Sequence, residues 1–181
     1  MEHYEARFAG VGGQGVILAG KILAYAYVVL EGGKAIQTPT YTAQVRGGAT
    51  KVDVVFDKTH IEYPKTEYIN FFLSLHQRSF DIYFKELTKD AIVIVDPNLT
   101  PKVPEKTTQR IIKVELIEIA KKELGRTLYA AVIAVGMFAR LTGFISEENI
   151  IKAVLDNAPK GTEESNLKAV KMGFDLASKY L

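Results

Sequence analysis

GVGGQGVILAGKI, residues 10–22, decides the fold of this 181-residue chain. Residues 4–11, which run into this stretch, alternate between apolar and polar side chains and predict a strand that stops at the glycines. The residues after it, 16–30, contain one glycine and no proline, and they predict a largely buried helix that ends at the glycine pair 32–33. A strand, a glycine-rich turn and a helix in this order are typical of the first unit of an α/β domain.

Further strands and a short helix are predicted in the first two thirds of the chain. Pro39 is expected to end the second strand. The third strand follows the second without an intervening helix, so the sheet is predicted to be largely parallel with room for an antiparallel pair. The predicted strands cover residues 34–38, 51–56, 68–75, 91–95 and 110–114, and the helix covers 79–87.

From residue 115 onward the pattern is helical. Helices are predicted at 115–124 and 128–141, and Ser146 and Thr162 are each expected to cap a further helix with the side-chain hydroxyl. The chain is therefore predicted to be one α/β domain over residues 1–181. We expect a three-layer α/β/α arrangement, a largely parallel and conceivably mixed sheet, and a helical C-terminal third.

Composition excludes several classes of function. The net charge of +2, from 23 basic and 21 acidic residues, is too balanced for a protein that binds nucleic acid or an anionic membrane. The chain has no cysteine, so it carries no disulfide, no thiol nucleophile and no cysteine-held iron–sulfur cluster. Its three histidines match no zinc-binding spacing. We predict no catalytic residue and no metal site on this chain.

The first residues and the apolar runs bear on localisation. Residues 1–5, MEHYE, lack the basic start and the apolar stretch of a signal peptide. The longest nearly apolar run, residues 128–139, is shorter than the ~20 residues that a membrane-spanning helix needs. We therefore expect a cytoplasmic protein.

The first glycine loop formally satisfies the pattern of dinucleotide-binding domains, because glycines stand at positions 10, 12 and 15. That pattern also requires an acidic residue ~20 positions further on, at the end of the second strand. Here the nearest acid, Glu31, precedes the second strand, which weakens the dehydrogenase interpretation. A P-loop is excluded because no Gly-Lys-Ser/Thr follows. Close helix packing explains one or two of the glycines, and a ligand or partner contact explains the whole GGQG run.

A second loop, residues 38–50 (TPTYTAQVRGGAT), carries Arg46 directly before two glycines. A guanidinium on so open a backbone suits a carboxylate or a phosphate, although for Arg46 taken alone a surface arginine in a turn is the favoured interpretation. The loop follows the second strand, where open α/β sheets place their ligand crevice. We expect this loop and the first glycine loop to meet at one rim of the sheet.

The two loops together resemble a known family. GVGGQGVILAGKILAYA followed by QTPTYTAQVRGGATKVDVVF is similar to the gamma subunit of 2-oxoacid:ferredoxin oxidoreductases, most of all to the 2-oxoglutarate type among its pyruvate and ketoisovalerate relatives. The segments 61–64 and 91–96 also resemble the family, and the likeness covers residues 6–155. Two departures stand out: Thr42 and Gln44 replace a glycine and a glutamate of the family's second loop, and the family's asparagine near the start of the long apolar helix is missing.

The resemblance implies a subunit of an oxidoreductase that is inactive on its own. Enzymes of this family decarboxylate a 2-oxoacid oxidatively to an acyl-CoA and reduce ferredoxin. It implies alpha and beta partner chains, and a delta ferredoxin-like chain in some complexes, which carry thiamine diphosphate, magnesium and iron–sulfur clusters. The fold would be that of domain III of pyruvate:ferredoxin oxidoreductase, a domain linked to coenzyme A binding. The residues implied to contact coenzyme A or a partner chain are Gly12, Gly13, Gln14, Gly15, Tyr41, Arg46, Gly47 and Gly48.

Two alternatives stay open: a free-standing dinucleotide-binding reductase and a non-catalytic interaction domain. The sequence does not decide which 2-oxoacid is the substrate or what the stoichiometry of the complex is. It also leaves open whether the two loops contact coenzyme A or a partner chain. Purified alone, the chain could form a homodimer through its exposed interface. Other conspicuous residues receive structural interpretations: His76 as a structural histidine, the pairs 147–148 and 163–164 as acids at helix starts, and the aromatic run 68–72 as core.

Overall fold

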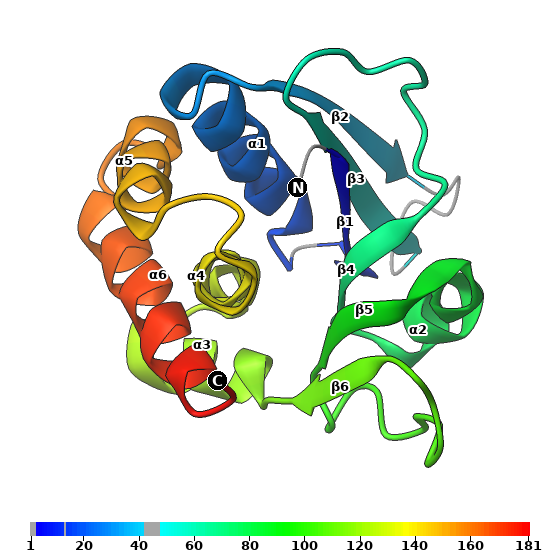
Figure 1. Ribbon diagram of the computed structural model, residues 1–181. Helices are drawn as coiled ribbons and strands as arrows, with labels where there is room; N and C mark the ends of the chain where they lie inside the picture. Colours follow the sequence, from blue (N-terminus) through cyan, green and yellow to red (C-terminus); the bar gives the residue numbers. More distant parts are fainter. Residues whose placement is uncertain (1–2, 13, 42–47) are drawn as a thin grey trace.

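The computed structural model describes residues 3–12, 14–41 and 48–181. Within these ranges the chain forms a six-stranded sheet and six α-helices, extended by short π- or 3-10 segments (Figure 1). The strands are β1 (His3–Val11), β2 (Lys34–Tyr41), β3 (Ala49–Asp57), β4 (Ile69–Ser74), β5 (Leu87–Val95) and β6 (Arg110–Lys113). The helices are α1 (Val16–Tyr25), α2 (Gln77–Tyr83), α3 (Leu116–Leu124), α4 (Ala130–Thr142), α5 (Glu147–Asn157) and α6 (Glu163–Ser178). The short segments are η1 (Ala26–Leu30), η2 (Phe84–Glu86) and η3 (Thr127–Tyr129).

The sheet is mixed, as the missing helix between the second and third strands predicted. Its order is β2-β3-β1-β4-β5-β6. Strands β1, β4, β5 and β6 are parallel neighbours, whereas β3 runs antiparallel to both β1 and β2. The α/β class, the parallel majority and the helical C-terminal third are all confirmed.

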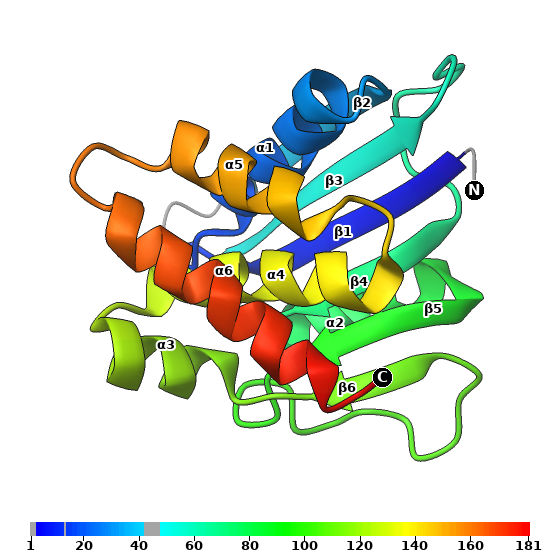
Figure 2. The ribbon, with the colours of Figure 1, turned by 60° about the vertical axis from the view of Figure 1, so that its left-hand side comes forward.

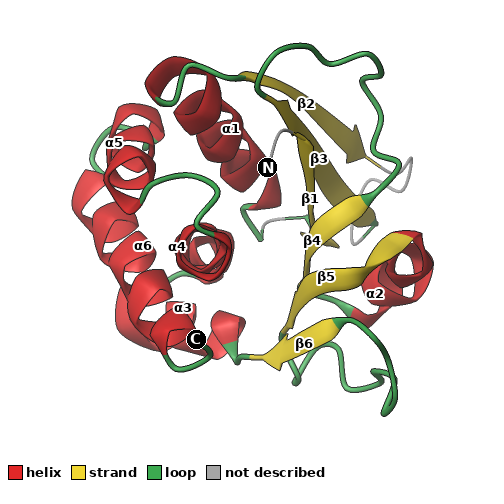
Figure 3. Cartoon of the chain, viewed as in Figure 1, coloured by secondary structure: helices red, strands yellow, loops and turns green. Residues whose placement is uncertain are grey.

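The two faces of the sheet are covered unequally. Figure 3 shows α1, α3, α4, α5 and α6 on one side of the sheet and α2 on the other. In the view of Figure 2, α6 crosses over α4, which itself lies against the strands. The layer on the α2 side is therefore thin, and the central layer of parallel strands is buried mainly by α1 and α4.

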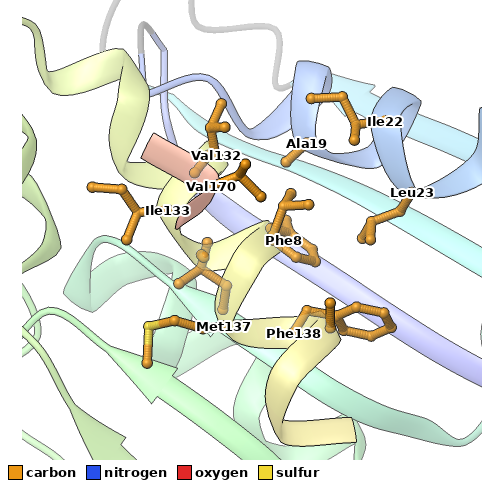
Figure 4. Close-up of a cluster of buried hydrophobic side chains, with 14 of the residues drawn as sticks. Phe8, Ala19, Ile22, Leu23, Val132, Ile133, Met137, Phe138 and Val170 are labelled. Atoms are coloured by element: carbon orange, nitrogen blue, oxygen red, sulfur yellow. The ribbon is translucent and has the colours of Figure 1, made fainter. Parts of the chain in front are cut away.

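The main core lies between the sheet and these helices. Phe8 of β1 and Phe138 of α4 are fully buried, and Figure 4 shows them packed beside side chains of α1 and α6. A smaller core on the opposite face joins Phe72 and Phe80, from β4 and α2. Although α4 is buried along most of its 13 residues, neither it nor any other helix in the described ranges combines the length and the apolar character that a membrane crossing requires.

Two local predictions were wrong. Pro39 does not end the second strand, because β2 continues to Tyr41. The strand tolerates proline since it forms an edge of the sheet, where a missing N–H need not cost a ladder bond. Thr162 does not cap α6 with its side chain; its hydroxyl donates to the Pro159 carbonyl (2.6 Å). The Ser146 prediction is confirmed, since its hydroxyl oxygen accepts from the Asn149 amide (3.3 Å).

Glycines allow α4 and α6 to pack at backbone distance. A Cβ built on Gly173 of α6 would lie 2.9 Å from the Cα of Gly136 and would overlap the carbonyl oxygen of Ile133. A Cβ on Gly136 would in turn overlap the carbonyl of Val170. The obstructing atoms belong to the backbone, so a side chain at either glycine requires the two helices to separate.

We expect Gly173→Ala to lower the free energy of unfolding by about 1–3 kcal/mol, because overpacking outweighs the gain in helix propensity. Urea unfolding followed by circular dichroism measures the change. Lys171→Ala, at an exposed position of the same helix, is the matched control and should stay within about 0.5 kcal/mol of wild type. A Gly173→Ala protein as stable as this control would contradict the close crossing.

Candidate functional site

The ends of the strands bring the flanks of both glycine loops together. Val11, the last residue of β1, pairs with Ala49, the first residue of β3, and Gly10 pairs with Thr50. Tyr41, the last residue of β2, pairs with the same Thr50 from the other side. The loop that leaves β1 and the loop that joins β2 to β3 therefore start at adjacent positions of one rim, which we call the glycine rim.

The eight residues predicted to form this site fall into two groups. Gly12, Gln14 and Gly15 are described, as are the backbone of Tyr41 and the buried Gly48. Gly13, Arg46 and Gly47 lie outside the described residues, together with the family departures at positions 42 and 44.

Gln14 has a supporting role that the sequence analysis did not foresee. Its side chain is 8% exposed, its Oε1 accepts from the Val11 amide (2.8 Å), and its Nε2 donates to the Leu75 carbonyl (3.2 Å). The amide thus ties the first glycine loop to the ends of β1 and β4. Because both polar atoms bond within the chain, the Gln14 side chain also shapes the loop.

The glycines of the first loop differ in what they do. Gly15 has a φ of +78° and forms the N-cap of α1, and a Cβ there would overlap the Leu128 carbonyl oxygen. Glycine is therefore required at position 15 for both the backbone conformation and the approach of η3. Gly12 is exposed, and a Cβ there would meet nothing within 4 Å. Position 12 is thus open towards any molecule that docks at the rim.

The start of α1 presents backbone donors at the glycine rim. Among the described residues no side chain caps this helix, and no acidic residue lies in its first turn. The first amide groups of a helix have no partner within the helix and carry the positive end of its dipole. The rim therefore favours negative charge.

Asp96 and Glu31, the acids that a dinucleotide site could draw on, are committed to structural contacts, and only Asp96 lies at the rim end of the sheet. Asp96, at the end of β5, is 1% exposed, and its carboxylate accepts from the Ile117 amide (2.9 Å) at the start of α3. Glu31 accepts from the Ser146 amide (2.9 Å) at the start of α5. Neither carboxylate is free for the ribose contact of a dinucleotide site, which argues against the dehydrogenase alternative.

The aromatic run 68–72 and His76 have mainly structural roles. Phe71 and Phe72 are fully buried, as predicted, but Tyr68 is 65% exposed. His76 is structural, as predicted: its Nδ1 accepts from the Arg78 amide (3.1 Å) at the start of α2.

A buried charged cluster on the α2 face escaped the sequence analysis. Arg7 of β1 is 2% exposed and forms two parallel hydrogen bonds to its strand partner Asp53, from Nε (2.6 Å) and from one terminal nitrogen (2.9 Å). Lys51 also pairs with Asp53, and Glu86 pairs with the outer side of Arg7. The signal was the alternation of charged and apolar residues in β1, which places position 7 on the face opposite Phe8.

This cluster joins several elements through one carboxylate. Burial alone would raise the pKa of Asp53, but the hydrogen bonds and charge of Arg7, followed by those of Lys51, hold that pKa below its ordinary value. Thr66 donates to Asp53 (3.1 Å), so the segment after β3 is attached as well. Arg7 also lies over the Tyr83 ring, 4.8 Å from its centroid, which connects α2 to the sheet.

No group of three or more histidine, aspartate or glutamate side chains in the described ranges is arranged to hold a metal ion.

Comparison with known proteins identifies the family. The profile described as "Pyruvate ferredoxin/flavodoxin oxidoreductase" matches residues 5–176 of the chain. The chain belongs to this family. The gamma-subunit resemblance inferred from the two glycine loops is thereby confirmed, and the chain is of the kind that forms a subunit of an oxidoreductase.

Three proteins that resemble this chain are compared with it. The 2-oxoglutarate synthase subunit KorC of Methanocaldococcus jannaschii is 38% identical, over 96% of this chain and 93% of KorC. The gamma subunit of a keto/oxoacid ferredoxin oxidoreductase from Geobacter sulfurreducens has a TM-score of 0.86 at 36% identity, covering 97% of this chain and 99% of that one. The 2-oxoglutarate:ferredoxin oxidoreductase of Magnetococcus marinus, solved with 2-oxoglutarate, coenzyme A and succinyl-CoA, has a TM-score of 0.84 at 19% identity. This chain matches 32% of that longer chain, and the likeness shows the fold alone.

We expect Asp53→Asn to cost about 3–5 kcal/mol of unfolding free energy at pH 7, because it leaves the buried Arg7 without its charged partner. Glu86→Gln is the control: the Glu86 side chain is 44% exposed, so its loss should cost about 1 kcal/mol or less. Urea unfolding measures both.

The same pair predicts a pH dependence. Since the pKa of Asp53 is lowered in the folded state, its stabilisation is present above the unfolded value of about 4 and is lost as the pH falls through the folded value. Asp53→Asn should therefore weaken the acid-side loss of stability seen in wild type. Identical pH profiles for the two proteins would contradict the ion pair.

Proposed function

We propose that this chain is the gamma subunit of a 2-oxoglutarate:ferredoxin oxidoreductase that works in the cytoplasm. The observation that carries the proposal is the match to KorC, a 2-oxoglutarate synthase subunit, at 38% identity over nearly the full length of both chains. The complex would decarboxylate the 2-oxoacid oxidatively, form an acyl-CoA and pass electrons to ferredoxin.

The composition of this chain supports the placement of the cofactors on other subunits of the complex. The chain has no cysteine, so iron–sulfur clusters belong on other subunits. Thiamine diphosphate and magnesium are assigned to the alpha and beta chains, with a delta ferredoxin-like chain as a further cluster carrier. The gamma chain packs on these subunits and supplies binding surface, and the isolated chain is inactive.

The glycine rim is the part of this chain proposed to meet coenzyme A. Gly12 is open, the amide hydrogens at the start of α1 are uncapped, and no acid lies in the first turn of that helix. These features fit the negative charge of the cofactor's phosphates. Arg46 is assigned a charge-assisted hydrogen bond to the same group, flanked by Tyr41, Gly47 and Gly48. Gln14 and Gly15 keep the loop in shape, and Gly13 is proposed to contact the cofactor together with Gly12.

The Arg46→Ala variant in the reconstituted complex tests the role of the rim. Loss of one charge-assisted hydrogen bond, about 1.5–3 kcal/mol, should raise the KM for coenzyme A by about 10- to 100-fold while the KM for 2-oxoglutarate stays near wild type. Steady-state reduction of ferredoxin measures both constants. Lys34→Ala, which removes an exposed charge at the other end of β2, is the matched control.

The outcomes separate the alternatives. An Arg46→Ala complex with unchanged coenzyme A KM and unchanged assembly would remove Arg46 from the proposal. Weakened assembly with unchanged KM would assign the two loops to a subunit interface. Failure of the chain to co-purify with alpha and beta chains, or the absence of 2-oxoglutarate-dependent ferredoxin reduction, would contradict the proposed function itself.

A further inference from the structure

A hollow in the surface adjoins the glycine rim. It has a volume of about 320 Å³, lies between the end of α3 and the start of η3, and is lined by Lys121, Gly125, Arg126, Thr127 and Leu128. It borders the first glycine loop directly, because a Cβ on Gly15 would overlap the carbonyl oxygen of Leu128. The hollow and the loop are therefore parts of one continuous surface.

The charge of this hollow is positive. Lys121 and Arg126 are exposed, and within the described part of the chain neither side chain makes a hydrogen bond or an ion pair. No acidic residue lines the hollow. Arg140 of α4, by contrast, is paired with Glu147 (2.8 Å). The two unpaired charges thus concentrate positive potential beside the rim.

Helix stabilisation accounts for only one of the two cations. Lys121 lies in the last turn of α3, where a positive charge also balances the helix dipole. Arg126 lies beyond Gly125, which ends that helix with a φ of +77°, and so it is not part of the last turn. A Cβ on Gly125 would meet nothing within 4 Å, so the hollow is open at this glycine.

We propose that this hollow is a phosphate subsite, with the Arg126 guanidinium as a bidentate hydrogen-bond donor and Lys121 as a second positive charge. The Thr127 hydroxyl, exposed and without a hydrogen bond within the described residues, is a further donor. The ligand is the phosphorylated ribose end of a nucleotide, since a planar guanidinium matches phosphate oxygens. This inference rests on the proposed function for the identity of the nucleotide as coenzyme A, because the hollow adjoins the rim assigned to that cofactor.

The test uses the full chain and adenosine 3′,5′-bisphosphate, the phosphate-bearing fragment of coenzyme A, in isothermal titration calorimetry. Wild type should bind it saturably, and the double variant Lys121→Ala/Arg126→Ala should bind it more weakly by about tenfold or more, the loss expected for one charge-assisted hydrogen bond. Lys160→Ala, at an exposed position in the loop before α6, is the matched control and should bind as wild type does. Equal thermal unfolding of all three proteins verifies that the fold is retained.

Two comparisons identify the ligand and separate this inference from the proposed function. Binding of inorganic phosphate as tightly as the bisphosphate would overturn the nucleotide assignment. Absence of saturable bisphosphate binding by wild type, or equal affinity in the double variant, would overturn the subsite. In the reconstituted complex, the double variant should raise the KM for coenzyme A but leave that for dephospho-coenzyme A nearly unchanged. If the complex has no 2-oxoglutarate activity, the calorimetric result still decides the subsite.

Discussion

The register of β1 in the sheet is the constraint on which the rest of the structure depends. Phe8 and its same-face neighbours are buried under α1 and α4, while Arg7 faces the other way and bonds to Asp53 on the paired strand. A shift by one residue would turn Arg7 into the main core and Phe8 out of it. The buried ion pair and the apolar face therefore select the same register. That register places the end of β1 opposite the start of β3, and so places both glycine loops at one rim.

Around this rim the chain separates supporting residues from residues left open to solvent. Gln14 and Asp96 have their polar atoms engaged within the protein, and each holds an element end in place. Gly12 is open, the first amides of α1 have no side-chain cap from the described residues, and Lys121 and Arg126 add positive charge nearby. A surface built from amide hydrogens and cations suits the phosphates of a nucleotide cofactor.

Sequence patterns predicted the elements well where local periodicity and local chemistry agreed. The strand–glycine–helix unit, the apolar α4 and the Ser146 cap follow from short-range rules, and the family resemblance followed from two motifs. Long-range contacts were out of reach. Pro39 lies inside a strand because β2 is an edge strand of the sheet. The Gln14 side chain is buried because it bonds to Leu75, the residue after β4. Neither contact can be predicted from the residues next to Pro39 or Gln14 in the sequence. The Arg7–Asp53 pair joins positions 46 residues apart, and only the pairing of β1 with β3 brings them together.

Hydrogen exchange on the assembled complex tests most directly the claim that the two glycine loops form one binding surface. Exchange is measured by mass spectrometry in the presence and absence of coenzyme A, on peptides spanning residues 10–18 and 41–51. Addition of the cofactor should slow both peptides together and leave peptides from the outer helices α5 and α6 unchanged. Slowing of only one loop, or protection confined to α5 and α6, would contradict a shared rim.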